Sequence, residues 1–167
     1  MQNKKPTLWR RKIGIKIRQA ESADIDAIYR IEQEQFLKPW KKDYFTAELS
    51  HDLSFFYAAQ DVESGDILGY MICWIIEETM ETHNIAVKGE HKRQGIGSRL
   101  MDFMLAKAAE EGVQEIFLEV RKTNIEAAGF YEKYDFKRIG CRERYYSDPV
   151  DDALVYALYL RHPKSTT

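Results

Sequence analysis

The sequence predicts an α/β domain with a mixed, mostly antiparallel sheet. Its length of 167 residues suits a single domain. Segments with strand periodicity alternate with segments of helical periodicity, giving about seven strands and about four helices in the order β-α-α-β-β-β-α-β-α-β-β. Strands joined by short turns pair antiparallel, whereas the two strand-helix-strand units predict one parallel pair at the centre of the sheet.

The N-terminal third is predicted to contain one strand and two helices. Alternating apolar residues from Ile13 to Ile17 indicate the strand. Ser22 is a candidate N-cap for a helix that ends near Gln35, and residues 42–49 form a second, short helix. We interpret the basic residues before this strand as part of a flexible tail over 1–12, with the domain at 13–160 and a C-terminal tail at 161–167. An electrostatic arm for an anionic partner is the alternative interpretation of the first tail.

Three strands follow, at 55–62, 67–77 and 80–87. The turn residues at 63–66 join the first two as a hairpin.

The C-terminal half is predicted to alternate helices and strands. A long helix covers 94–111, with one apolar face and Gly112 as its C-cap residue. The remaining elements are a strand at 115–121, a helix at 125–134, and strands at 136–145 and 154–160.

Composition and charge exclude several classes of function. The net charge of −2 argues against a protein that binds nucleic acid directly through bulk charge. The longest apolar run, 67–76, is about half the length of a membrane-spanning helix, so it is interpreted as a buried strand and no membrane contact is expected. Cys73 and Cys141 lack metal-ligand spacing. We therefore expect no metal, and a cytoplasmic location in a reducing compartment.

The most informative segment is the loop between the strand at 80–87 and the helix at 94–111. It carries the basic residues Lys92 and Arg93, followed by Gly95 and Gly97. A helix start exposes unpaired N–H groups and the positive end of the helix dipole, and glycines let an anion approach the backbone. The loop matches neither the Walker pattern nor the dinucleotide fingerprint. Close packing between helix and strand is the alternative reason for the two glycines.

This segment resembles motif A of the GNAT acetyltransferase superfamily, in which Gln/Arg-x-x-Gly-x-Gly/Ala holds the diphosphate of CoA. Lys92 stands at the Gln/Arg position, and Gly95 and Gly97 at the glycine positions. The resemblance implies a GNAT fold with a splayed central strand pair, and acetyl-CoA as cosubstrate. The cofactor-binding residues that it implies are Ile85, Ala86, Val87, Lys92, Arg93, Gln94, Gly95, Ile96, Gly97 and Ser98.

A second segment, 118–136, resembles motif B of the same superfamily. It contains Leu-Glu-Val-Arg-x-x-Asn followed by Phe-Tyr-x-x-x-Asp-Phe. Asp135 replaces the usual glycine, which requires that it adopt a left-handed turn. The resemblance implies that Asn124 bonds the pantetheine of CoA and that Tyr131 contacts its sulfur. N-capping of the helix is the alternative role of Asn124.

The flanks resemble one subfamily more closely. Residues 31–36 with Pro39-Trp40, and Tyr145-Tyr146 followed by 151–153, are similar to RimI-type enzymes and to catalytic subunits of the NatA type. This resemblance implies Nα-acetylation, with the N-termini of proteins or nascent chains as partners, ribosomal proteins among them. The substrate-binding residues that it implies are Glu34, Phe36, Tyr145 and Tyr146.

The proposed chemistry needs a base and an acid. An α-amino group has a pKa of about 7.7–8.0, against about 10.4 for a lysine side chain, so a carboxylate acting through water is sufficient. Glu119 is the leading candidate, because its strand alternates and a carboxylate at the centre of such a strand is rarely an arbitrary surface charge. A cation pair that only orders the sheet is its alternative role. Glu81 is the second candidate base, and a solvated strand-end charge is its alternative role.

Tyr131 is the candidate acid, because a phenol can donate a hydrogen bond to a departing thiolate. Packing on the core is the alternative. The function expected from the sequence is therefore acetyl-CoA-dependent Nα-acetylation by direct attack of the amine on the thioester. Acetylation of lysine side chains or small amines is the alternative enzyme function, and a CoA-binding regulatory module is the alternative without catalysis.

Overall fold

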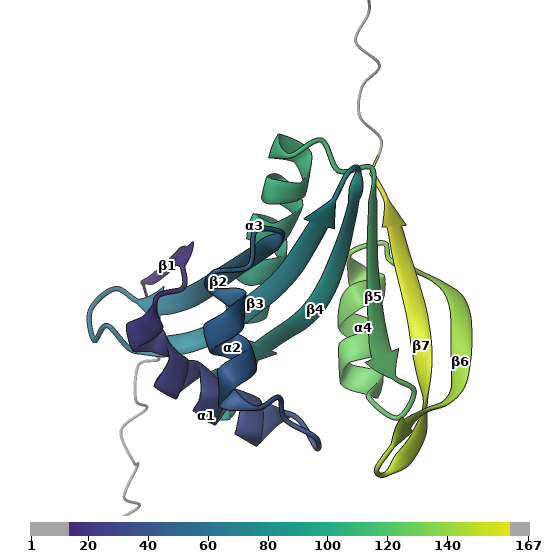
Figure 1. Cartoon of the computed structure of the whole chain (residues 1–167), viewed down its shortest axis with the longest axis horizontal. Coiled ribbons are helices and arrows are strands. Elements are labelled where there is room, and N and C mark those ends of the chain that lie inside the picture. Colours follow the sequence, from purple (N-terminus) through teal and green to yellow (C-terminus); the bar gives the residue numbers. More distant parts are fainter. Residues whose placement is uncertain (1–13, 161–167) are drawn as a thin grey trace, which may run out of the picture.

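The computed structural model describes residues 14–160, and the predicted tails at 1–12 and 161–167 lie outside them. The chain folds into one seven-stranded sheet flanked by helices (Figure 1). The strands are β1 (Ile15–Gln19), β2 (Ser54–Asp61), β3 (Ile67–Ile76), β4 (Thr79–Val87), β5 (Glu115–Arg121), β6 (Lys137–Ser147) and β7 (Val150–Tyr159). The α-helices within the described residues are α1 (Ile25–Gln35), α2 (Lys42–Glu48), α3 (Ile96–Glu110) and α4 (Ile125–Lys133).

The sheet has the mixed topology that the sequence predicts. Its strand order is β1-β2-β3-β4-β5-β7-β6, and every neighbouring pair is antiparallel except β4 with β5. The parallel pair arises because α3 carries the chain from the end of β4 back to the start of β5. The prediction of one central parallel pair is confirmed.

Two hydrophobic cores lie on the two faces of the sheet. One core packs α1 and α2 against β2, β3 and β4, with Ile28, Phe45 and Tyr70 fully buried in it. The other packs α3 and α4 against the opposite face, with Leu100 and Met104 fully buried. Figure 1 shows α1 and α2 in front of the sheet and α3 and α4 behind it. The sheet therefore separates two layers of helices.

The parallel pair splays apart along its length. β4 and β5 are paired only from Thr79 with Glu115 to Thr82 with Leu118. β4 continues to Val87, so the main chain of its second half has β3 on one side and no β5 partner on the other. Figure 1 shows the resulting V-shaped gap, which opens toward the α1–α2 loop and the β6–β7 hairpin. The predicted splayed pair is confirmed.

A β-bulge lies where the splay begins. In the pairing of β3 with β4, Ile72 faces Asn84 and Cys73 faces Thr82, so His83 is an extra residue on β4. Thr82 contacts Met104 on the α3 side, whereas Asn84 contacts Glu32 of α1. The bulge therefore changes which side chains of β4 face each layer, at the point where the two strands separate.

Several local predictions hold and others need correction. Asp135 adopts the predicted left-handed conformation with φ 64°, and Gly112 follows α3 with φ 74°. Ser22 is not the N-cap of α1, because a 3-10 turn precedes the helix and Asp24 accepts the Glu21 N–H at 2.8 Å instead.

Two predicted boundaries also differ from the structure. α3 begins two residues later than predicted, at Ile96, because Arg93 and Gly95 both have positive φ. β7 begins at Val150 rather than Leu154, because its first residues pair with the end of β6.

None of the helices between residues 14 and 160 is long and apolar enough to cross a membrane.

Candidate active site

The open end of the gap leads into the start of α3. β4 ends at Val87, and a short 3-10 turn (Gly89–His91) connects it to Gly95, the N-cap residue of α3. Gly95 has φ 83° and Arg93 has φ 61°, both left-handed. The first helical hydrogen bond runs from the Arg99 N–H to the Gly95 oxygen at 3.0 Å. The N–H groups of the three residues between Gly95 and Arg99 precede this first helical donor, so they have no acceptor within α3.

These amides, on Ile96, Gly97 and Ser98, form what we call the amide cradle. A Cβ built at Gly95 would meet no heavy atom within 4 Å, and one at Gly97 would lie 3.7 Å from the Phe130 ring, an ordinary contact. Close packing therefore does not require either glycine. The open backbone and the positive end of a 15-residue helix suit an anion such as a phosphate.

Basic residues lie in the turn that leads to the amide cradle. Lys88 pairs with Glu90 at 2.5 Å, and this hydrogen bond raises the pKa of Lys88. The side chains of Lys92 and Arg93 are exposed. Gln94 donates to the Glu90 carbonyl at 3.1 Å, which holds the turn before the helix. The predicted cofactor residues of this segment are therefore brought together around one helix start.

The remaining predicted cofactor residues lie along the gap. Ile85, Ala86 and Val87 pair with β3 on one side only. Their other main-chain edge faces the gap, where an extended ligand can add as a strand. Asn124 caps α4, because its side-chain oxygen accepts the Ala127 N–H at 3.1 Å. The capping role considered for Asn124 is thus present in the structure.

Tyr131 lies on α4 and belongs to the core on the α3–α4 face of the sheet. It is 8% exposed and its ring packs edge-on against Phe130 and Phe136 at 5.6 and 5.8 Å. Burial raises its pKa well above the ordinary value for tyrosine, and the charges of Cys73 and Tyr146 act in the same direction. Tyr131 is therefore a protonated phenol at neutral pH, within electrostatic reach of Tyr146 on β6.

Glu119 lies on the other face of β5, opposite the buried residues Leu118 and Val120. This placement matches the alternation predicted from the sequence. The Arg142 Nε lies 3.1 Å from Glu119 Oε1, so the cation partner considered for Glu119 is present. Tyr145 also interacts with this carboxylate, whose charge and hydrogen bond raise the pKa of Tyr145.

Tyr146 stands beside Tyr145, with ring centroids 5.2 Å apart. The Arg121 guanidinium lies 4.0 Å from the centroid of the Tyr146 ring and donates to the Pro149 carbonyl at 3.0 Å. Burial, followed by the charge of Glu119, raises the pKa of Tyr146. Both predicted tyrosines thus lie beside the candidate base.

The second candidate base, Glu81, lies on the paired part of β4, opposite Phe117 of β5. It is exposed, and its charge favours the protonated form of His83. Burial has the larger effect and lowers the pKa of His83, whose ring lies 4.6 Å from that of Trp74. Because Glu81 is level with Phe117, which precedes Glu119 by two residues on β5, Glu81 lies farther from the open end of the gap than Glu119 does.

The two predicted substrate residues of α1 occupy different surroundings. The Glu34 carboxylate accepts the Gly89 N–H at 3.2 Å, so it contacts the turn that leads to the amide cradle. Phe36 is half-buried and packs against the core under α1 and α2. The loop that follows it ends at Trp40, whose N–H donates to Glu32 at 2.8 Å.

The comparisons with known proteins agree with this geometry. A model of the acetyltransferase (GNAT) family matches residues 25–136. The chain belongs to the GNAT acetyltransferase family. The family uses acetyl-CoA.

Two curated relatives and one solved structure resemble this acetyltransferase along nearly its whole length. A ribosomal protein bS18 alanine N-acetyltransferase of Haemophilus influenzae is 31% identical, over 86% of this chain and 98% of the relative. An N-alpha-acetyltransferase of Sulfolobus acidocaldarius is 30% identical, over 89% of this chain and 95% of the relative. The crystal structure of the ribosomal-protein-S18-alanine N-acetyltransferase of Escherichia coli superposes with a TM-score of 0.83 at 26% identity, covering 92% and 99% of the two chains.

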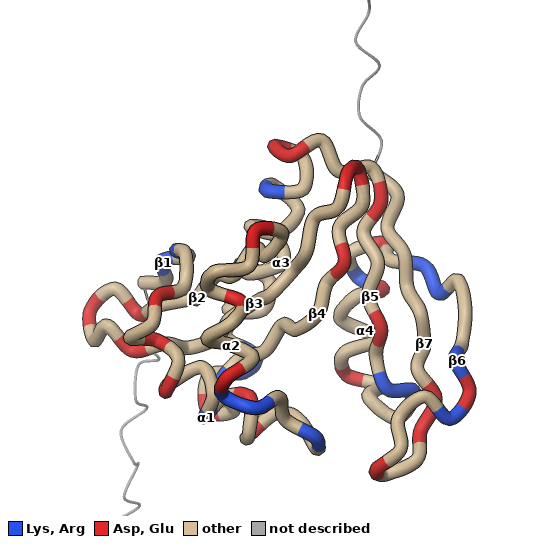
Figure 2. The backbone as a smooth tube through the Cα atoms, in the orientation of Figure 1, with Lys and Arg blue, Asp and Glu red and all other residues tan. Residues whose placement is uncertain are grey.

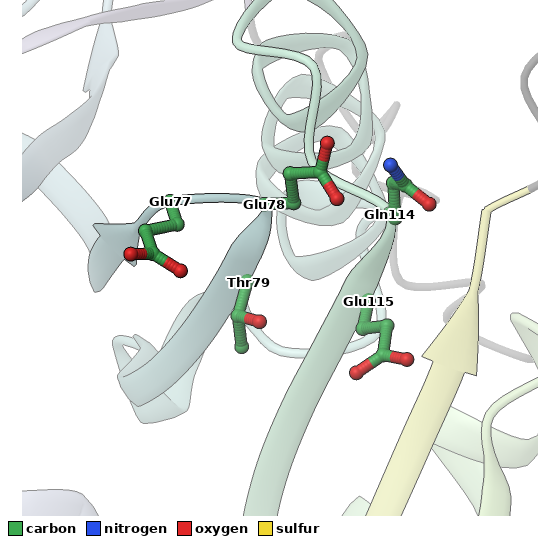
Figure 3. Close-up of a pocket in the computed structure, with 5 residues that line it drawn as sticks. All are labelled: Glu77, Glu78, Thr79, Gln114 and Glu115. Atoms are coloured by element: carbon green, nitrogen blue, oxygen red, sulfur yellow. The ribbon is translucent and has the colours of Figure 1, made fainter.

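A pocket of about 460 Å³ lies at the opposite, closed end of this GNAT domain (Figure 3). It is lined by Glu77, Glu78, Thr79, Gln114 and Glu115, where β4 and β5 begin. None of the predicted site residues lines it. Over residues 14–160, no group of three or more His, Cys, Asp or Glu side chains is arranged to hold a metal ion.

Sequence reasoning missed two residues beside the site of this acetyltransferase. Arg142 was missed because its contact with Glu119 depends on the register of β6, which local periodicity does not reveal. Glu32 was missed although a signal exists: it follows Ile28 by four residues and therefore lies on the apolar face of α1, where a carboxylate is unusual.

Proposed function

We propose that this protein transfers the acetyl group of acetyl-CoA to the α-amino group of protein N-termini. The observation that carries the proposal is the splayed β4–β5 pair, with the amide cradle after the end of β4 and with Glu119 and Tyr131 both within electrostatic reach of Tyr146. Glu119 comes from the α1 face of the sheet and Tyr131 from the α4 layer. The similarity to N-terminal alanine and N-alpha acetyltransferases supports the same reaction.

The residues present fit acetyl-CoA, which supplies the activated acyl group. The amides of Ile96, Gly97 and Ser98 would hold its diphosphate with Lys92 and Arg93 nearby, and the free edge of Ile85–Val87 would hold its pantetheine. The open space beside Gly95 supports this fit, because no side chain blocks the backbone there.

Glu119 would accept the proton of the incoming ammonium, directly or through one water. Tyr131 would donate a hydrogen bond to the departing sulfur. A thiol has a pKa of about 8.5, whereas burial raises the pKa of Tyr131 above that of an ordinary phenol. A hydrogen bond from Tyr131 to the sulfur is therefore favoured over complete proton transfer. The amine attacks the thioester directly, and this chain contributes binding, orientation and proton acceptance.

We further propose that the peptide enters between the α1–α2 loop and the β6–β7 hairpin. Tyr145 and Tyr146 border this entrance on one side and Phe36 on the other. Protein N-termini and nascent chains, including those of ribosomal proteins, are the proposed partners, and the cytoplasm is the proposed compartment.

The test is acetyl-CoA turnover on a panel of peptides that vary the first two residues. One control peptide has a blocked α-amine and an internal lysine. We expect acetylation of free α-amines and little acetylation of the lysine control. Acetylation of the lysine control alone would reject the proposed function in favour of side-chain acetylation.

Variants of the two proton-carrying residues test the mechanism. Glu119→Gln and Tyr131→Phe should each lower kcat at least about tenfold while acetyl-CoA binding stays intact. Glu115→Gln is the matched control, because it lies on the same face of β5 at the closed end and should keep full activity. Unchanged rates in either of the first two variants would remove that residue from the mechanism.

A further inference from the structure

The candidate base is held by a strand that is not its neighbour. β7 lies between β5 and β6, yet Arg142 of β6 reaches Glu119 of β5 at 3.1 Å. Adjacent strands lie about 4.8 Å apart, so this contact spans roughly twice that distance and requires a long side chain. Arginine has the required length and presents an N–H donor at Nε.

The sheet provides a path for this side chain. Arg142 pairs with Ala153 of β7, and Ala153 pairs in turn with Arg121 of β5, so the three lie on one face. Ala153 is fully buried and ends at its Cβ. A small residue at this position leaves room for a β6 side chain to cross β7 and reach β5.

A bulge in β6 brings a second group to the same carboxylate. The register shifts between Arg142 and Tyr146, where residues 143–145 face the single residue Asp152. Arg144 has φ 51°, and its N–H donates to Asp152 Oδ1 at 2.9 Å, which holds the bulge. Tyr145, inside the bulge, thereby also interacts with Glu119.

The ion pair is too exposed to be explained by stability. The Arg142 side chain is 59% exposed and that of Glu119 is 27% exposed. Pairs that are this accessible to water contribute little to folding, because solvent screens the charges and two long side chains lose freedom. What the pair does provide is geometric, because two groups of β6 contact the same carboxylate.

We propose that Arg142 is a positioning residue for acetyl transfer. Its Nε–H, together with the Tyr145 hydroxyl, fixes the Glu119 carboxylate in the orientation from which it accepts the proton of the amine. This inference rests on the proposed function, since it gives Glu119 the role of the base.

The test compares the steady-state kinetics of Arg142→Gln, Arg142→Lys and the wild-type enzyme. Arg142→Gln should lower kcat about tenfold, leave KM for acetyl-CoA within about twofold, and leave the Tm unchanged. Arg142→Lys keeps the charge but lacks the Nε donor, so its kcat should lie between the two. Arg138→Gln is the control, because Arg138 is an exposed arginine of the same strand whose partner, Tyr156, is buried on the α4 side.

A double variant separates positioning from other roles. In a Glu119→Gln background, Arg142→Gln should cause no further loss, because the group that it positions is gone. An additive loss, or a higher peptide KM with unchanged kcat, would overturn the proposal and indicate a direct contact with the peptide. Full activity of Arg142→Gln alongside an impaired Glu119→Gln would overturn it while leaving the proposed function standing. Full activity of Glu119→Gln would instead contradict the proposed base.

The geometry is also testable without turnover. Crystal structures of the wild-type protein and of Arg142→Gln should show one Glu119 orientation in the first and a rotated or multiple orientation in the second. The same single orientation in both would overturn the proposal.

Discussion

The two sides of the proposed peptide entrance are built in different ways. On the α1–α2 side, the carboxylate of Glu32 is 1% exposed and accepts hydrogen bonds from the Tyr70 hydroxyl, the Asn84 amide at 3.3 Å and the Trp40 N–H at 2.8 Å. On the β6–β7 side, the polar contacts lie at the surface, and the ion pair between Lys122 and Asp152 of β7 at 2.9 Å is one of them.

This difference indicates how each side responds to a ligand. A buried and fully bonded carboxylate ties the α1–α2 loop to β3 and β4, so the loop moves only if the core is disturbed. Surface ion pairs such as that of Lys122 with Asp152 contribute little to stability. We therefore infer that the α1–α2 side is a fixed wall and that the β6–β7 side adjusts to the peptide. Figure 2 shows charged segments on both sides of this open end.

The largest expected effect is on the buried network. Glu32→Ala leaves the Tyr70 hydroxyl and the Asn84 amide without their acceptor inside the core, and should lower the free energy of unfolding by about 3 kcal/mol. Urea denaturation monitored by Trp fluorescence measures this change. Gln33→Ala, on the exposed face of the same helix, is the control and should change it by no more than about 0.5 kcal/mol. A loss below about 1 kcal/mol for Glu32→Ala would contradict a fixed wall.

Acidification should change the contributions of Glu32 and Asp152 to folding stability in opposite directions. Burial raises the pKa of Glu32, so its contribution to stability is complete at low pH and declines as the pH rises through its folded value. Hydrogen bonds, first from the Arg144 N–H and then from Lys122, lower the pKa of Asp152. Its contribution is present at neutral pH and is lost as the pH falls below about 4.

Two amides that each donate to a carboxylate allow a direct comparison. Hydrogen exchange, corrected for intrinsic rates, should show the Arg144 N–H losing protection as the pH falls below about 4 while the Trp40 N–H keeps its protection. Earlier loss at Trp40 would reverse the assignment of fixed and adjustable sides.

The smallest expected effect is at the contact that joins the two sides. Lys38 donates to the Ser147 hydroxyl at 3.3 Å, and both groups are exposed. Ser147→Ala should change the free energy of unfolding by less than about 0.5 kcal/mol and kcat/KM for a peptide by less than about twofold. A tenfold loss of kcat/KM would show that the two sides act as a clamp.

Features specified by local sequence were predictable. The glycines at the start of α3 and the alternation that places Glu119 opposite Leu118 depend on few neighbours, and both appear in the structure as expected. The central parallel pair followed from a strand, a long helix and a second strand in succession.

Features specified by pairing register were not predictable. Arg142 reaches Glu119 because of a shift in β6, and His83 is displaced by a bulge in β4. Both shifts depend on which residues of a distant strand are opposite, which no local pattern reveals. Two partners of Glu32, Tyr70 and Asn84, lie on strands that are far from α1 in the sequence. At Ser22 a local rule failed, because the carboxylate of Asp24 satisfies the preceding backbone instead.

A crystal structure with a conjugate of CoA and the α-amine of an alanine-starting peptide would test the account most directly. We expect the diphosphate on the amides of Ile96, Gly97 and Ser98, and the peptide nitrogen beside Glu119 at the open end of the gap. A diphosphate bound away from these amides, or a peptide lying outside the space between the α1–α2 loop and the β6–β7 hairpin, would contradict it.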